Sequence, residues 1–252
     1  RLRTLPLAFS SIFMAAFLAA VNEKFDASIL LLCLLTTLFL QTLSNLSNDY
    51  GDSISGVDNS DRLGPVRAVQ SGKINLIQMK RAMIICSLLA FLSGIILIIY
   101  VFNGAWVQMF IFFMLGLLAI AAAVKYTVGE RPYGYRGLGD VFVFIFFGII
   151  GVFGSYYLFD TTINYVFLLP AFSCGFLSVG VLNVNNIRDM DSDRKAGKKS
   201  VPVRLGRQYA IYYHALLLML AFLSALIFVI IMKLSFYSYT FLLVTPLYYR
   251  HF

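Results

Sequence analysis

Two segments of the sequence carry carboxylates and amides at the spacing of a helix. In the first segment the polar residues recur every three or four positions: Asn45, Asn48, Asp49 and Asp52. In the second segment they recur every four positions: Asn185, Asp189 and Asp193. Residues at these intervals share one face of a helix. Each segment is therefore expected to present a cluster of oxygen ligands at a helix end.

These clusters predict a metal site. Neighbouring carboxylates repel one another unless a cation neutralises them, and a set of oxygen ligands alone favours a hard ion such as Mg²⁺. Bound in this way, Mg²⁺ keeps coordination positions open for phosphate oxygens. The candidate ligands are Asn48, Asp49, Asp52, Asp189 and Asp193, with Asp58 and Asp61 as further candidates. The alternative is that these acids pair with neighbouring Arg and Lys residues as solvated helix ends.

Basic and aromatic residues near the clusters predict a diphosphate site. Arg67 lies in a loop rich in turn formers, and its planar guanidinium can bind two phosphate oxygens at once. Tyr126, Tyr133 and Tyr135 are candidates for a lid over an aromatic acceptor, with interfacial anchoring of each tyrosine as the alternative. The candidate substrate-binding residues are Asn45, Asn48, Arg67, Lys125, Tyr126, Tyr133, Arg136, Asn185, Arg188 and Lys195.

The elements that must position these residues are membrane helices. Of the 252 residues, 60% are hydrophobic and 13% are charged, a composition that excludes an ordinary soluble domain. Apolar runs of about twenty residues, long enough to cross a bilayer, begin near Leu5, Ser28, Ala82, Val107, Asp140, Tyr165, Tyr209 and Leu234. The sequence therefore predicts an all-α, polytopic bundle with eight spans, in a chain expected to be incomplete at both ends.

The charge distribution predicts the orientation of the bundle. If the chain starts inside, all but two of the 20 Lys and Arg residues fall in inside segments, the exceptions being Lys24 and Lys233. The positive-inside rule then places both acidic clusters on the cytoplasmic side of the cell membrane. The net charge of +8 fits anionic lipid or a phosphorylated substrate better than nucleic acid, because the basic residues lie in loops between spans. No obligate protein partner is evident.

The acidic segments also indicate an internal repeat. They lie about 140 residues, or four spans, apart, and each follows the second span of a group of four. We expect a single domain over residues 1–252, with pseudo-repeats at about 1–125 and 138–252. A duplicated bundle of this kind would bring the two clusters face to face.

Longer motifs around these residues resemble the UbiA superfamily of intramembrane prenyltransferases. Within it they look most like the 1,4-dihydroxy-2-naphthoate polyprenyltransferases of menaquinone synthesis. The matching motifs occur in the expected order along the chain: Asn48-Asp49-Tyr-Gly-Asp52, Gly64-Pro-Val-Arg67, Tyr126-Thr-Val-Gly, Tyr133-Gly-Tyr135-Arg136-Gly-Leu-Gly139-Asp140 and Asn185-Asn-Ile-Arg-Asp189 followed by Asp193, Arg194, Gly197 and Lys198.

The resemblance implies a nine-helix bundle whose last helix lies beyond Phe252. It implies two Mg²⁺ ions that are held by the acidic motifs and clamp a polyprenyl diphosphate. Superfamily members often carry a further Asp at the position of Gly56, which is why Asp58 and Asp61 are considered in its place. The implied catalytic residues are Asp49, Asp52, Asp189, Asp193 and Arg67.

The implied reaction transfers the polyprenyl group to 1,4-dihydroxy-2-naphthoate, releases CO₂ and diphosphate, and gives a demethylmenaquinone. Another aromatic acceptor, such as 4-hydroxybenzoate, homogentisate or haem, would use the same metal and diphosphate machinery. A CDP-alcohol phosphotransferase would need a compact Asp-Gly-x-x-Ala-Arg motif, which the sequence lacks. A cation-coupled transporter would carry carboxylates deep within its spans, whereas the acids here lie at helix ends.

Overall fold

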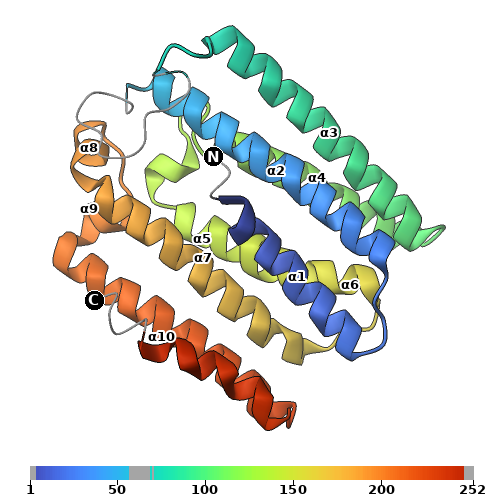
Figure 1. Ribbon diagram of the computed structural model, residues 1–252. Coiled ribbons are helices and arrows are strands. Elements are labelled where there is room, and N and C mark those ends of the chain that lie inside the picture. Colours follow the sequence, from blue (N-terminus) through green and yellow to red (C-terminus); the bar gives the residue numbers. More distant parts are fainter. Residues whose placement is uncertain (1–3, 57–68, 70, 247–252) are drawn as a thin grey trace.

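The computed structural model describes residues 4–56, 69 and 71–246 and confirms the prediction of an all-α bundle (Figure 1). Its first part contains α1 (Leu5–Val21), α2 (Ala27–Ile54), α3 (Leu76–Phe102) and α4 (Trp106–Lys125). A short 3₁₀ turn, η2 (Tyr133–Arg136), leads into the second part. The second part contains α5 (Gly139–Val143), the π-helix η3 (Phe144–Gly154), α6 (Ser155–Phe159), the 3₁₀ turn η4 (Tyr165–Phe167), α7 (Leu168–Arg188), α8 (Met190–Lys195), α9 (Val201–Leu205), α10 (Arg207–Ile231) and the 3₁₀ helix η5 (Phe236–Val244).

The long helices lie side by side, with α1 between two groups of helices (Figure 1). On one side α2 packs against α3 and α4, and on the other side α7 packs against α10 and η3. α1 contacts both α2 and η3 and so joins the two groups. Small residues allow this central position, because Ala15 and Ala19 are fully buried against Val152, Phe167 and Ala171.

Among the described residues, six helical segments are long and apolar enough to span a membrane, which makes this a multi-pass membrane protein. They run over residues 27–54, 76–102, 106–125, 139–159, 165–188 and 207–231. The prediction of eight spans differs from the structure at the first and last apolar runs. α1 is apolar but has only 17 residues, and the last run forms the nine-residue 3₁₀ helix η5. The other six predicted spans agree with the structure. This agreement is expected, because hydropathy over about twenty residues is the strongest sequence signal of a membrane helix.

Local sequence explains where the helices that carry the site begin. Asp26 caps α2, because its carboxylate accepts hydrogen bonds from the backbone N–H groups of Ser28 and Ile29 at 2.7 and 3.1 Å. Asn75 and Gln78 form a reciprocal capping box at the start of α3. α2 then continues for 28 residues to Ile54. One unbroken helix therefore runs from the cap at Asp26 to the first acidic segment.

Candidate active site

The first acidic segment forms the last turns of α2, where Asn45, Asp49 and Asp52 are buried. Asp52 is only 2% exposed. Asn45 is tied to the start of the chain, because its side-chain amide donates to the Thr4 hydroxyl at 2.9 Å and Gln41 donates to the same hydroxyl at 3.0 Å. The sequence prediction of one polar helical face is therefore confirmed for this segment.

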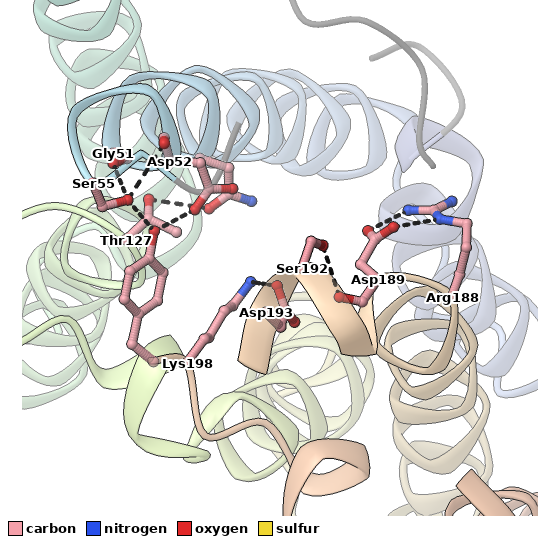
Figure 2. A network of polar contacts seen from close by, with 11 residues as sticks. Gly51, Asp52, Ser55, Thr127, Arg188, Asp189, Ser192, Asp193 and Lys198 are labelled. Carbon is pink, nitrogen blue, oxygen red and sulfur yellow. Dashed lines mark hydrogen bonds and ion pairs between the residues drawn. The ribbon is translucent and has the colours of Figure 1, made fainter. Parts of the chain in front are cut away.

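The loop after α4 covers this segment with hydroxyl groups. The Thr127 hydroxyl donates to the Ser47 carbonyl at 2.8 Å and contacts the Asn48 side-chain oxygen at 3.3 Å. The Tyr135 hydroxyl donates to Asp52 Oδ1 and lies 2.7 Å from the Ser55 hydroxyl. Figure 2 shows Asp52, Ser55 and Thr127 gathered on the same side of the site. Hydroxyl donors about eighty positions away therefore orient the Asn48 and Asp52 side chains of the first segment.

The second acidic segment is not one continuous helix, so this part of the sequence prediction is wrong. α7 ends at Arg188, and Asp189 stands at the junction before α8. The Arg188 guanidinium binds Asp189 through two bonds, of 2.6 and 2.8 Å, and the Ser192 hydroxyl donates to the Asp189 carbonyl at 2.8 Å (Figure 2). A helical break is local, and spacing alone does not reveal it, because the residues on both sides of it are helical.

Asp193 is the most deeply buried carboxylate of the second segment. It is 1% exposed, and its Oδ1 lies 3.3 Å from the Lys198 ammonium (Figure 2). Within the described residues its Oδ2 is buried and has no hydrogen-bond partner. Burial raises the pKa of the Asp193 carboxyl, while Lys198 opposes the shift and the charges of Asp189 and Asp52 add to it. The carboxylates of both segments therefore share one electrostatic site.

A cavity of ≈ 350 Å³ with mostly apolar walls reaches the first acidic segment at Asn48. Gln41, Ser44 and Asn48 of α2 line one side, and Tyr126 and Tyr133 line another. The two tyrosine rings meet edge to face at 5.3 Å. Burial raises the pKa of both phenols, so both keep their protons. These tyrosines therefore line the cavity, and their role as a lid over an acceptor stays a prediction.

The remaining predicted residues lie in varied positions. Lys125, Arg136 and Lys195 are exposed, and Arg136 presents its carbonyl to the Arg204 guanidinium. Asn185 is half-buried, whereas its neighbours Asn183 and Asn186 are buried. Three of the predicted residues lie outside the described part of the chain: Asp58, Asp61 and Arg67.

Sequence reasoning missed several residues of the site. Thr127 and Tyr135 belong to motifs that were noticed, but nothing in their spacing indicates that they contact the first segment. Lys198 belongs to one of the matching motifs, but the motif does not indicate its contact with Asp193. A Lys five residues after a buried Asp is the one signal that points to the observed pair.

The comparisons with known proteins agree with this geometry. A model of the UbiA prenyltransferase family matches residues 8–252. The chain belongs to the UbiA prenyltransferase family. Among its UbiA relatives is the 1,4-dihydroxy-2-naphthoate octaprenyltransferase of Haemophilus influenzae, which is 45% identical over 253 residues covering 100% of this chain and 82% of the relative.

Two further UbiA relatives bear the same name. The Escherichia coli protein is 46% identical over 247 residues, covering 98% of this chain and 80% of its own length. The Mycobacterium tuberculosis protein is 36% identical over 206 residues, covering 82% and 68%. No solved structure matched the chain significantly.

UbiA prenyltransferases generally depend on Mg²⁺, and the chemistry of the residues present fits this ion. In the part of the chain that the structure describes, no three His, Cys, Asp or Glu residues come close enough to form a cage by themselves. Mg²⁺ needs no such cage, because it binds through one or two carboxylates and completes its shell with water and phosphate oxygens. The buried Asp193 Oδ2, which lacks a hydrogen-bond partner among the described residues, is the kind of oxygen that a cation would satisfy.

Proposed function

We propose that this UbiA family member transfers a polyprenyl group from polyprenyl diphosphate to 1,4-dihydroxy-2-naphthoate. The products are diphosphate, CO₂ and demethylmenaquinone in its reduced form. The observation that carries the proposal is the electrostatic interaction of two carboxylate-rich segments, the first of which borders an apolar cavity at Asn48, in a chain 45% identical to a naphthoate octaprenyltransferase along its whole length. The carboxylates of the two segments suit a diphosphate with its cation, and the apolar cavity suits an isoprenoid and an aromatic ring.

The candidate residues fall into two groups, one that binds the cation and one that binds the diphosphate. Asn48, Asp49, Asp52, Asp189 and Asp193 are proposed to hold Mg²⁺, which when bound supplies the positive charge that stabilises the departing diphosphate. The proposed diphosphate contacts are five basic residues of the sequence: Arg67, Lys125, Arg136, Arg188 and Lys195. Of these, Arg188 already lies within the site, because it binds Asp189.

The reaction needs no covalent enzyme intermediate. The bond between the first prenyl carbon and the diphosphate oxygen breaks, and the oxygen keeps the electron pair. The ring carbon that bears the carboxylate supplies the pair for the new carbon–carbon bond. Loss of CO₂ then returns a pair to the ring, so the electrons balance without an oxidant.

The cavity walls exclude water from the developing carbocation. A volume of ≈ 350 Å³ lies at the low end of the ~300–1,000 Å³ usual for small-ligand sites. This space suits the aromatic acceptor and the first isoprene units, while the rest of a long prenyl tail would extend into lipid. We place the site at the cytoplasmic face of the cell membrane, because nearly all Lys and Arg residues lie in the loops at that end.

The test is a turnover assay with purified protein in detergent. The protein is incubated with Mg²⁺, octaprenyl diphosphate and carboxyl-labelled 1,4-dihydroxy-2-naphthoate, and labelled CO₂ and the lipid-soluble product are measured. Asp52→Asn and Asp193→Asn should each lower the rate by about 100-fold or more, because each removes a charge that holds the cation. Asp191→Asn is the matched control, since Asp191 is exposed and should leave the rate at the parent level.

The assay also separates the possible acceptors. Parallel reactions with 4-hydroxybenzoate and homogentisate should give no product. If the parent protein prenylates one of these instead, 1,4-dihydroxy-2-naphthoate is not the acceptor, but the result still agrees with prenyl transfer by a UbiA family member. Consumption of no prenyl diphosphate with any aromatic acceptor would sink the proposed function.

A further inference from the structure

Tyr135 contacts both acidic segments from a short turn between them. It belongs to η2, in the loop that joins the two parts of the bundle. Its phenol hydroxyl donates to Asp52 Oδ1 in the first segment. Its backbone carbonyl accepts a hydrogen bond of 2.8 Å from the N–H of Lys199, which follows the second segment. No residue was assigned this bridging position from the sequence.

The hydroxyl bond has a fixed direction. An ionised carboxylate can only accept hydrogen bonds, so the single phenol proton points to Asp52. The Ser55 hydroxyl lies 2.7 Å from the same phenol oxygen and 2.9 Å from the Gly51 carbonyl, at the end of α2. Because the terminal torsion of a carboxylate is broad, the Tyr135 hydroxyl helps to fix the direction in which the Asp52 oxygens point.

The ring of Tyr135 takes part in the second segment. The Lys198 ammonium lies 5.3 Å from the ring centroid, within the range of a cation–π contact. The same ammonium lies 3.3 Å from Asp193 Oδ1, and its side chain is only 12% exposed. Tyr135 thus flanks the cation that neutralises the most buried carboxylate of the site.

The turn that carries Tyr135 is held on the second segment by its neighbours. The Arg204 guanidinium donates to the Arg136 carbonyl and, at 3.1 Å, to the Lys199 carbonyl. Two adjacent backbone groups of η2 are therefore tied to Lys199 in the loop after α8 and to Arg204 in α9. A turn anchored in this way can hold the Tyr135 phenol in one position between two acidic segments that belong to different helices.

We propose that Tyr135 is a positioning residue that sets Asp52 and Lys198 for cation and diphosphate binding. This inference rests on the proposed function. Tyr135 acts through the residues that it contacts: the hydroxyl aims the Asp52 carboxylate, and the ring keeps Lys198 beside Asp193. Loss of the hydroxyl should therefore weaken the binding of the cation without unfolding the bundle.

The experiment measures how much Mg²⁺ supports the binding of radiolabelled farnesyl thiolodiphosphate, an analogue that does not react. Tyr135→Phe keeps the ring and removes the hydroxyl. Because a hydrogen bond to a charged group contributes substantially to the free energy of binding, its loss should raise the Mg²⁺ concentration for half-maximal binding about tenfold. Tyr135→Leu removes the ring as well and should raise it further.

Tyr100→Phe is the matched control. Tyr100 donates to Asp26 at 3.3 Å at the other end of the bundle, so this variant also deletes a bond between a phenol and a carboxylate. It should bind the analogue with the Mg²⁺ dependence of the parent. Thermal unfolding of Tyr135→Phe should match that of Tyr100→Phe, which would separate a change in the site from a loss of fold.

The outcomes distinguish this inference from the proposed function. Parent-like Mg²⁺ dependence in Tyr135→Phe would overturn the positioning role, even if the parent prenylates the naphthoate acceptor. A shifted Mg²⁺ dependence would support the role, even if another acceptor proves to be the substrate. Analogue binding by the parent that is indifferent to Mg²⁺ would overturn the role together with the metal site.

Discussion

The two acidic segments have similar sequences and different structures. In the first, Asp52 lies on an unbroken helix and accepts a hydrogen bond from the neutral phenol of Tyr135. In the second, the helix ends before Asp189, and Asp193 binds the charged ammonium of Lys198. The first contact joins residues 83 positions apart, and the second joins residues five apart.

This difference indicates how each segment is kept in place. The first depends on the packing of a distant loop against the end of α2, so a change in packing should disturb it. The acidic residues of the second segment pair with basic residues that are close to them in the sequence, so a change in charge should disturb this segment. Duplication of the two halves of the chain remains a prediction. If it occurred, the acidic residues of the two segments are now held in place by different contacts.

The largest effect is expected from Gly51→Ala, which tests the packing of the first segment. A Cβ atom at Gly51 would lie 2.7 Å from the carbonyl carbon of Thr127, and this backbone cannot move aside easily. Overpacking of this kind costs about 1–3 kcal/mol. The unfolding temperature should therefore fall by roughly 2–4 °C per kcal/mol in a chain of this size, measured by thermal unfolding in detergent.

Gly116→Ala is the control for that variant. Gly116 lies within α4, and an added Cβ would meet nothing within 4 Å. Because Ala favours a helix over Gly by about 1 kcal/mol, this variant should unfold at the parent temperature or higher. Equal stability of Gly51→Ala and the parent would mean that the loop does not pack tightly on α2, and the comparison of the two segments would lose its basis.

The second prediction tests the charges of the second segment. Lys198→Met keeps the length of the side chain and removes the ammonium from the buried carboxylate of Asp193. Loss of a partner by a buried charged group costs about 1–3 kcal/mol, so the unfolding free energy should fall by about 2 kcal/mol. Chemical unfolding of the variant beside the parent gives this difference.

Arg188→Met provides the comparison within the same segment. The Arg188 and Asp189 side chains are 39% and 15% exposed, against 12% and 2% for Lys198 and Asp193. Exposed ion pairs contribute about 0–1 kcal/mol, so Arg188→Met should cost less than Lys198→Met. The reverse order would show that burial does not decide the strength of these pairs.

The sequence predicted the first segment better than the second for a physical reason. Helical spacing is reliable where the helix continues, as α2 does from Ala27 to Ile54. It failed at Asp189, where the chain leaves the helix for one residue and resumes in α8. Hydropathy likewise located six spans but did not show that the fourth of them, residues 139–159, contains a π-helix, η3.

The contacts that complete the site could not be predicted from a single sequence. The bonds of Thr127 to Asn48 and of Tyr135 to Asp52 cross about eighty residues, and such pairs form only when the bundle has folded. Charge and spacing identify which residues can bind a cation and a diphosphate. Which hydroxyl groups orient them depends on the tertiary packing of the loop after α4.

A small effect is also expected from Asp26→Ala, at the other end of α2. The carboxylate caps the helix, and the backbone N–H of Ile29 is the main cause of its lowered pKa. Loss of this cap should cost about 1 kcal/mol near neutral pH. Because the pKa is lower in the folded protein, this stabilisation is present above the unfolded pKa of about 3.9 and disappears as the pH falls through the folded value.

The difference in unfolding temperature between the parent and Asp26→Ala should therefore be full at pH 7 and shrink below pH ~4. Asp26→Asn keeps an acceptor at the cap and should lie close to the parent at pH 7. Neither variant should change the Mg²⁺ dependence of analogue binding, because the loop after α4 orients the first segment at the opposite end of α2. A changed Mg²⁺ dependence would mean that the whole of α2, and not the loop, sets the position of Asp52.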